Sequence, residues 1–169
     1  MKHVWSLLYT LVLGLWVGGI ALFTFLATPV IFHSFNRDMA ALIVDRLFPV
    51  YFAYLFALSA IAFALYVLAT SAKPAFRSWF CLGLLFGALV ISSFVLFKLY
   101  PDIAAVKMQV ATFERDPDSP ARKLFSRMHA VSAVLNLLMF ADGISLLLLN
   151  TANRERDGNS ESPRTECVR

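Results

Sequence analysis

Four long stretches of the chain contain almost no charged side chains. Asp, Glu, Lys and Arg are absent from 4–32, 47–72 and 78–97, and the stretch 128–151 contains only Asp142. A hydrocarbon core about 30 Å thick requires about 20 helical residues, and none of these stretches shows the apolar–polar alternation of a membrane barrel strand. The pattern therefore predicts four transmembrane helices, over about 4–32, 47–72, 78–99 and 124–150.

The segments that connect these spans are predicted to contain short amphipathic helices. Asn36 is suited to cap a helix over Arg37–Leu47, and Pro49 then marks a break or a fresh first turn. Ser119 and Pro120 are suited to be the N-cap and first residue of the helix that becomes the fourth span. After the third span one helical face carries a row of apolar residues, Ile103, Val106, Val110 and Phe113.

The end of the first span and the end of the fourth span each carry a further signal. Pro29 removes a backbone hydrogen bond, so we expect it to disturb the last turns of the first span. After Asn150 the chain becomes polar, and 151–169 is predicted to be a disordered tail. The predicted organisation is one transmembrane domain over 1–150 followed by this tail.

Composition supports an integral membrane protein and excludes an ordinary soluble domain. Hydrophobic residues are 59% of the chain and charged residues 15%, whereas soluble domains average about 45–50% and about 25%. The predicted fold class is all-α, a four-helix bundle whose partner is the lipid bilayer. The net charge of +4 suits anionic headgroups, and no basic patch with groove-reading elements predicts binding to nucleic acid.

Four spans place both termini and the loop between the second and third spans on one side of the membrane, side A. Side A holds seven Lys and Arg residues and the opposite side, side B, holds eight, so the positive-inside rule does not fix the orientation. The basic loop at Lys73 and Arg77 favours a cytoplasmic side A, and we expect the plasma (inner) membrane. The two cysteines, Cys81 and Cys167, predict no disulfide framework.

Small residues spaced four apart occur in two of the predicted spans. Small residues at this spacing let helix backbones approach closely in lipid. We expect packing within the bundle, and a homo-oligomer face is the alternative. The residues are Gly14 and Gly18 in the first span and Gly83 and Gly87 in the third.

Two histidines fall at the side B ends of their spans, His33 in the first and His129 in the fourth. Imidazole is a common ligand of haem and transition metals, so one hypothesis is a haem or metal site between them. The simpler interpretation is two interfacial side chains bonded to backbone or carboxylates, because no third ligand has diagnostic spacing. On this interpretation the protein has no cofactor.

The fourth span carries further polar residues. His129, Ser132 and Asn136 share one helical face, which we expect to point into the bundle. Asp142 lies off that face and deep in the span, where an ionisable residue is by default a functional candidate. Its candidate partners are His3, Lys73 and Arg77, and the structural alternative is a hydrogen bond between helices.

Several motifs together resemble the transmembrane-protein-205-like family of small four-helix membrane proteins, classed under domain of unknown function 4149. The resemblance covers roughly 9–149. Its most specific pieces are Leu-Phe-Pro-x-Tyr-Phe at 47–52 and His-x2-Ser-x3-Asn-Leu at 129–137. It implies a four-helix fold and a connection with resistance or transport. The positions that it singles out are Gly18, Arg37, Pro49, His129 and Asn136.

The sequence favours a non-enzymatic helix bundle that handles a small solute, with Arg37, His129 and Asn136 organising the side B mouth by hydrogen bonds. No nucleophile motif or phosphate loop points to a hydrolase or a nucleotide-driven pump. Two alternatives stay open: a haem-dependent or metal-dependent oxidoreductase that uses His33 and His129, and a scaffold subunit of a membrane complex.

Overall fold

The computed structural model describes residues 2–69, 76–109 and 119–160, and these ranges are almost entirely helical. Four continuous helical rods are long and apolar enough to cross a membrane: Val4–Ser34, Arg37–Leu68, Ser78–Lys107 and Pro120–Ala152. The described residues contain no strand. The predicted all-α membrane bundle is confirmed. Its elements are α1 (Lys2–Ala21), the π-helical turn η1 (Leu22–Ala27), α2 (Thr28–Ser34), α3 (Arg37–Ala69), α4 (Phe76–Phe94), the π-helical turn η2 (Val95–Leu99), α5 (Tyr100–Lys107) and α6 (Pro120–Ser160).

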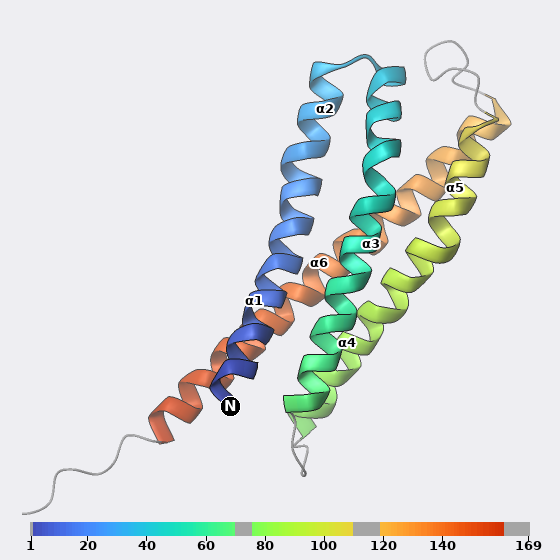
Figure 1. Ribbon diagram of the computed structural model, residues 1–169. Helices are drawn as coiled ribbons and strands as arrows, with labels where there is room; N and C mark the ends of the chain where they lie inside the picture. The colour runs from blue at the N-terminus through green and yellow to red at the C-terminus, as the bar shows by residue number, and fades with distance from the viewer. Residues whose placement is uncertain (1, 70–75, 110–118, 161–169) are drawn as a thin grey trace, which may run out of the picture.

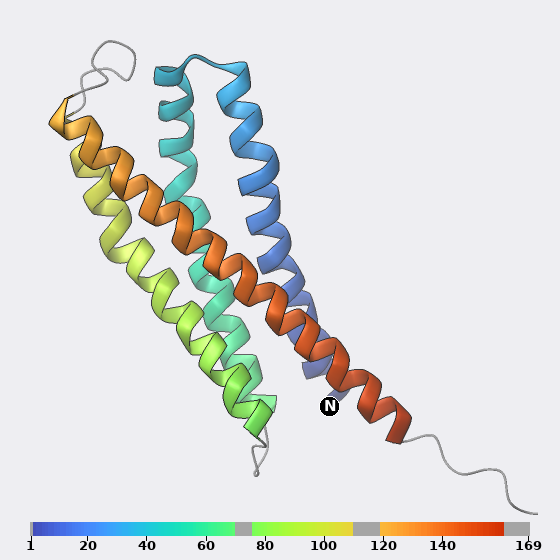
Figure 2. The same ribbon diagram turned by 180° about the vertical axis from the view of Figure 1, so that it is seen from behind.

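The helices form a layer that one long helix crosses. Helices α1, α3 and α4 lie side by side in that order, and α6 runs diagonally over one face of the layer (Figure 1). Figure 2 shows α6 passing from beside α5 at one end of the bundle to beside α1 at the other. Towards side B the pair α2 and α3 diverges from α5 and the start of α6, and both views show this separation.

Helix α3 is a single helix from Arg37 to Ala69, so the prediction of a separate amphipathic helix ending near Pro49 was wrong. The predicted cap is confirmed, because the backbone N–H of Met39 donates to Asn36 Oδ1 at 2.9 Å. Pro49 lies inside the helix, where it leaves the carbonyl of Asp45 without its usual donor. The hydroxyl of Tyr100 donates to that carbonyl at 3.4 Å, which offsets part of the cost of the proline.

The other two span prolines follow widened helical turns. Pro29 follows η1 and Pro101 follows η2, and such π-helical turns re-route the hydrogen bonds that a proline breaks. In the first span the Thr28 hydroxyl donates to the Phe23 carbonyl at 2.9 Å. Because α4, η2 and α5 form one rod, the amphipathic stretch after Tyr100 continues the third span, which corrects the second predicted short helix. Val110 and Phe113 lie outside the described residues.

Helix α6 starts as predicted and ends later than predicted. Its first residue is Pro120, and the backbone N–H of Arg122 donates to Ser119 Oγ at 3.4 Å. The helix continues to Ser160, so the expected boundary at Asn150 is corrected. Good helix formers after Asn150, including Ala152 and Arg154, favour this extension. Residues 161–169 lie outside the described ranges.

The tightly packed core lies in the middle and side A half of the bundle. Its fully buried side chains come from every rod: Leu13, Trp16, Ile20, Leu55, Leu85, Met139 and Leu146. The outward faces are also apolar, with Leu7, Phe86 and Leu148 each more than half exposed, as expected for a surface that faces lipid. At about 1.5 Å per residue α3 is roughly 50 Å long, so its first turns extend beyond a hydrocarbon core about 30 Å thick.

Candidate functional site

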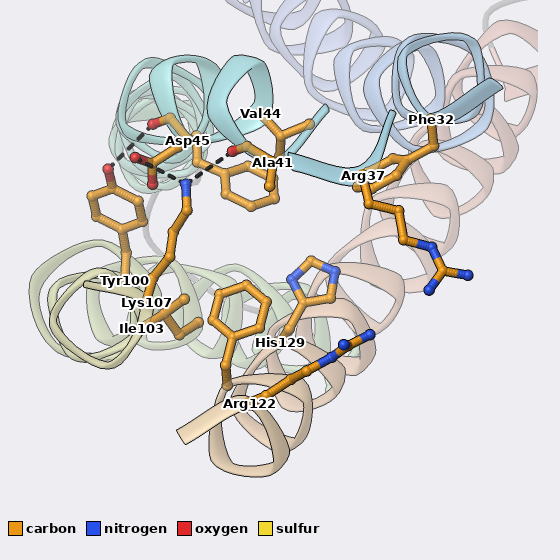
Figure 3. A pocket seen from close by; sticks show the side chains of 12 residues that line it. Phe32, Arg37, Ala41, Val44, Asp45, Tyr100, Ile103, Lys107, Arg122 and His129 are labelled. Carbon is orange, nitrogen blue, oxygen red and sulfur yellow. Dashed lines mark hydrogen bonds and ion pairs between the residues drawn. The ribbon is translucent and has the colours of Figure 1, made fainter. Parts of the chain in front are cut away.

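The divergence of the helices leaves a cavity of about 320 Å³ at side B. Its walls are the end of α2, the first turns of α3, helix α5 and the first turns of α6 (Figure 3). Each wall comes from a helix segment at the side B end of its span, so the cavity lies towards one end of the bundle and not in its middle. Cavities of about 300–1,000 Å³ accommodate small molecules, and this one is at the small end of that range.

One wall of the cavity is held by an ion pair. Lys107 Nζ of α5 lies 3.2 Å from Asp45 Oδ2 of α3 and donates to the Ala41 carbonyl at 2.9 Å. The Lys107 side chain is only 15% exposed, so its charge faces these two α3 acceptors and not water. Together with the bond from Tyr100 to the backbone carbonyl of Asp45, this contact ties α5 to α3. It also neutralises the one carboxylate among the described residues that line the cavity.

Two further cations line the cavity, and neither has a counterion among the described residues. Figure 3 shows the guanidinium groups of Arg37 and Arg122 on the far side of the cavity from Lys107, with the ring of His129 beside them. Among the described residues neither guanidinium group makes a side-chain hydrogen bond or an ion pair. Among the described residues, the lining therefore holds three permanent cations (Arg37, Lys107 and Arg122) and one carboxylate, Asp45.

The rest of the lining is aromatic and aliphatic. The His129 ring stacks on Phe125, with 6.0 Å between centroids and 7° between planes, and lies 6.1 Å from the Phe48 ring. Phe32 closes the α2 side. The cavity thus combines an apolar lining with guanidinium groups at one side, an arrangement that suits a ligand with a charged head and an apolar body.

Asn136 lies deeper in the bundle than the sequence analysis expected. Its Oδ1 accepts a hydrogen bond from the Tyr51 hydroxyl at 2.6 Å, and its Nδ2 donates to Thr24 Oγ1 at 2.8 Å. These bonds join α6, α3 and η1, and Tyr51 also stacks on Phe23 with centroids 4.1 Å apart. The inward-facing stripe of α6 is confirmed, because Ser132 is buried and His129 lines the cavity. Asn136 does not line the cavity, so the expectation that it organises the mouth is corrected.

Asp142 occupies the packed half, away from the cavity. Both of its carboxylate oxygens are buried without a hydrogen-bond partner among the described residues, and so is Nε1 of the fully buried Trp16. The predicted partners of Asp142 were His3, Lys73 and Arg77. Their side chains lie outside the part of the chain that the structure describes. Asp142 and the side B residues Arg37 and His129 are therefore not parts of one site.

The predicted packing glycines lie on open helix surfaces. A methyl group built at Gly14, Gly18, Gly83 or Gly87 meets nothing within 4 Å, which overturns the expectation that these residues set contacts within the bundle. A homo-oligomer face at these positions stays a prediction. The close helix contacts use two other glycines: at Gly143 such a methyl group lies 2.7 Å from Val17 Cγ2, and at Gly19 it overlaps the ring of Tyr54. Gly143 has no small residue four positions away, so the spacing rule could not find it.

The two histidines differ in their surroundings. His129 lines the cavity, whereas His33 is exposed, stands outside the lining, and has Nδ1 2.8 Å from the carbonyl oxygen of Pro29. The described residues contain no group of three or more His, Cys, Asp or Glu side chains placed to hold a metal ion. The cavity thus presents one imidazole and not the pair of ligands that the haem hypothesis requires.

Comparison with known families gives one match. The model of a family described as domain of unknown function (DUF4149) matches residues 11–112, which includes the cavity walls from α2, α3 and α5 and excludes α6. Among curated proteins and among solved structures no significant match was found.

Proposed function

Because the chain belongs to the DUF4149 family and has four membrane-spanning helices, we propose that it is a membrane protein that binds a small amphipathic solute in its side B cavity. On this proposal it acts without covalent chemistry. The bilayer is its surrounding partner, the termini are cytoplasmic, and a homo-oligomer stays the alternative to a single copy.

The observation that carries the proposal is an apolar lining with charged side chains at its border, at one end of the bundle. The cavity is apolar over most of its wall and is bordered by charged side chains, and it lies at the side B ends of the four spans. A ligand there keeps its apolar part against Phe32, Phe48 and Phe125 and its polar part at the charged border. The ion pair of Lys107 and Asp45 joins two of the walls, α5 and α3.

A photolabelling experiment tests this proposal. The protein is reconstituted in phosphatidylcholine nanodiscs with a neutral long-chain alcohol that carries a diazirine, and labelled peptides are mapped by mass spectrometry. We expect labelling to concentrate on 41–48 and 100–107. It should disappear in Ala41→Trp, which fills the cavity, and persist in Leu42→Trp, because Leu42 is exposed and does not line the cavity. Labelling spread evenly over the lipid-facing helices and unchanged in Ala41→Trp would refute the solute site.

A further inference from the structure

The side B cavity has an excess of fixed positive charge that no described residue neutralises. Asp45 is occupied by Lys107 at 3.2 Å, which leaves Arg37 and Arg122 without a counterion among the described side chains. Both guanidinium groups lie on the same side of the cavity (Figure 3). An anion that lies between two guanidinium groups is attracted by both of them, so this part of the lining favours a negatively charged group.

The N-terminal ends of α3 and α6 add to the preference for an anion. Arg37 is the first residue of α3 and Arg122 lies in the first turn of α6, so both cations stand at N-terminal helix ends, which favour negative charge. Arginine binds carboxylate and phosphate oxygens through paired N–H groups. Behind the two arginines, His129 and Phe125 stack on one another and continue into the apolar part of the lining.

We propose that the cavity binds an amphipathic anion, with a phosphate or carboxylate head between Arg37 and Arg122 and a hydrocarbon chain against Phe32, Phe48 and Phe125. This inference rests on the proposed function and names its ligand class. Such an anion has two sources, a free single-chain amphiphile or the headgroup of an anionic phospholipid, and the shared chemistry is the same for both. The cavity volume of about 320 Å³ suits the head and first part of one chain and not a whole phospholipid.

The test compares two diazirine probes of equal chain length, a dodecyl phosphate and a dodecyl alcohol, in phosphatidylcholine nanodiscs at pH 7, where the phosphate is ionised. We expect the phosphate to label the cavity at least about ten times more efficiently than the alcohol, because each charge-assisted contact is worth about a factor of ten. The variant Arg37→Gln with Arg122→Gln should label equally with both probes.

The matched control is Arg46→Gln with Arg127→Gln. It removes the same charge at the same end of the bundle from exposed residues that do not line the cavity, and it should keep the preference for phosphate. Because none of the four arginines makes a side-chain bond to a described residue, both double variants should fold, and equal melting temperatures in detergent verify this.

Two lipid compositions identify the source of the anion. If phosphatidylglycerol in the nanodisc displaces the phosphate probe, the natural ligand is a lipid headgroup; if it does not, the ligand is a free amphiphilic anion, and both results support the inference. Equal labelling of the cavity by phosphate and alcohol in the unaltered protein would overturn it while leaving the solute site intact. An equal loss of preference in the control variant would also overturn it, and absence of cavity labelling by either probe would refute the proposed function itself.

Discussion

The two ends of the bundle are built from the same four rods but differ in how closely these rods pack. In the middle and side A half the rods pack closely around Trp16, Leu85 and Met139, and a glycine is needed where α6 meets α1. At side B the rods diverge (Figure 1), and the side chains there line a cavity with a charged border. The comparison indicates that the packed half holds the fold together and that the open half is available for a ligand.

The difference follows from what each end contributes to stability. Closely packed apolar side chains gain dispersion energy that is lost when a gap opens. The side B walls gain less from packing and instead use directed contacts, such as the ion pair of Lys107 with Asp45 and the bond from Tyr100 to Asp45. Such contacts join α5 to α3 beside the cavity without filling it.

The largest effect is expected from Trp16→Ala. This indole is fully buried, and deletion of a buried aromatic side chain costs about 3–5 kcal/mol. At the open end Phe32→Ala removes a side chain that is 46% exposed and should cost less than about 1 kcal/mol. Unfolding equilibria in mixed micelles measure both. Equal losses would show that the two ends do not differ in packing.

The next effect is overpacking at the crossing of α1 and α6. Gly143→Leu places a side chain where even a methyl group lies 2.7 Å from Val17, and forced repacking costs about 1–3 kcal/mol. Gly83→Leu is the control, because nothing lies within 4 Å of that position, and we expect a change within about 0.5 kcal/mol. A loss at Gly83 as large as that at Gly143 would contradict the assignment of Gly83 to an open surface.

A smaller loss is expected from Asn136→Leu, which removes the bonds to Tyr51 and Thr24. Hydrogen bonds between membrane helices average about 0.6 kcal/mol, so the two together should contribute about 1 kcal/mol. A double-mutant cycle with Tyr51→Phe isolates the shorter bond. A coupling energy of zero would mean that the network positions Tyr51 without stabilising the bundle.

The smallest effect is expected from the ion pair at the cavity wall. Asp45 is 38% exposed, so solvent screens its attraction to Lys107, and the coupling should be about 0.5 kcal/mol. A cycle with Lys107→Met and Asp45→Asn at low and high salt measures it, and the coupling should fall as salt rises. A coupling that salt does not change would place the pair in a drier environment than its exposure indicates.

Much of the fold followed from the distribution of charge along the chain. The four spans, the Asn36 cap and the start of α6 were predictable because each depends on nearby residues alone. The continuity of α3 through Pro49 was not, because the freed carbonyl of Asp45 finds its donor in Tyr100, a residue distant in sequence. The end of α6 was missed because polarity was taken as a sign of disorder, although Ala152, Arg154, Glu155 and Arg156 are good helix formers.

The candidate site was only partly predictable for a related reason. His129 was found because the span topology places it at side B, and Arg37 was found through the family resemblance. Arg122 and the pair of Lys107 with Asp45 needed the helix packing to bring them to one cavity. The spacing of Gly14, Gly18, Gly83 and Gly87 predicted contacts that their positions do not make. Periodicity shows which residues share a face, but it does not show which face meets another helix.

The most direct test of the open cavity uses a single cysteine in each half of the molecule, with Cys81→Ser and Cys167→Ser removing the native thiols. Ala41→Cys lies in the cavity lining, and Ala88→Cys lies in the packed half at a position 1% exposed. We predict that a small polar maleimide modifies Cys at position 41 and that dodecyl phosphate protects it, while position 88 stays unmodified. Equal modification at both positions, or modification at position 41 that dodecyl phosphate does not slow, would contradict the account.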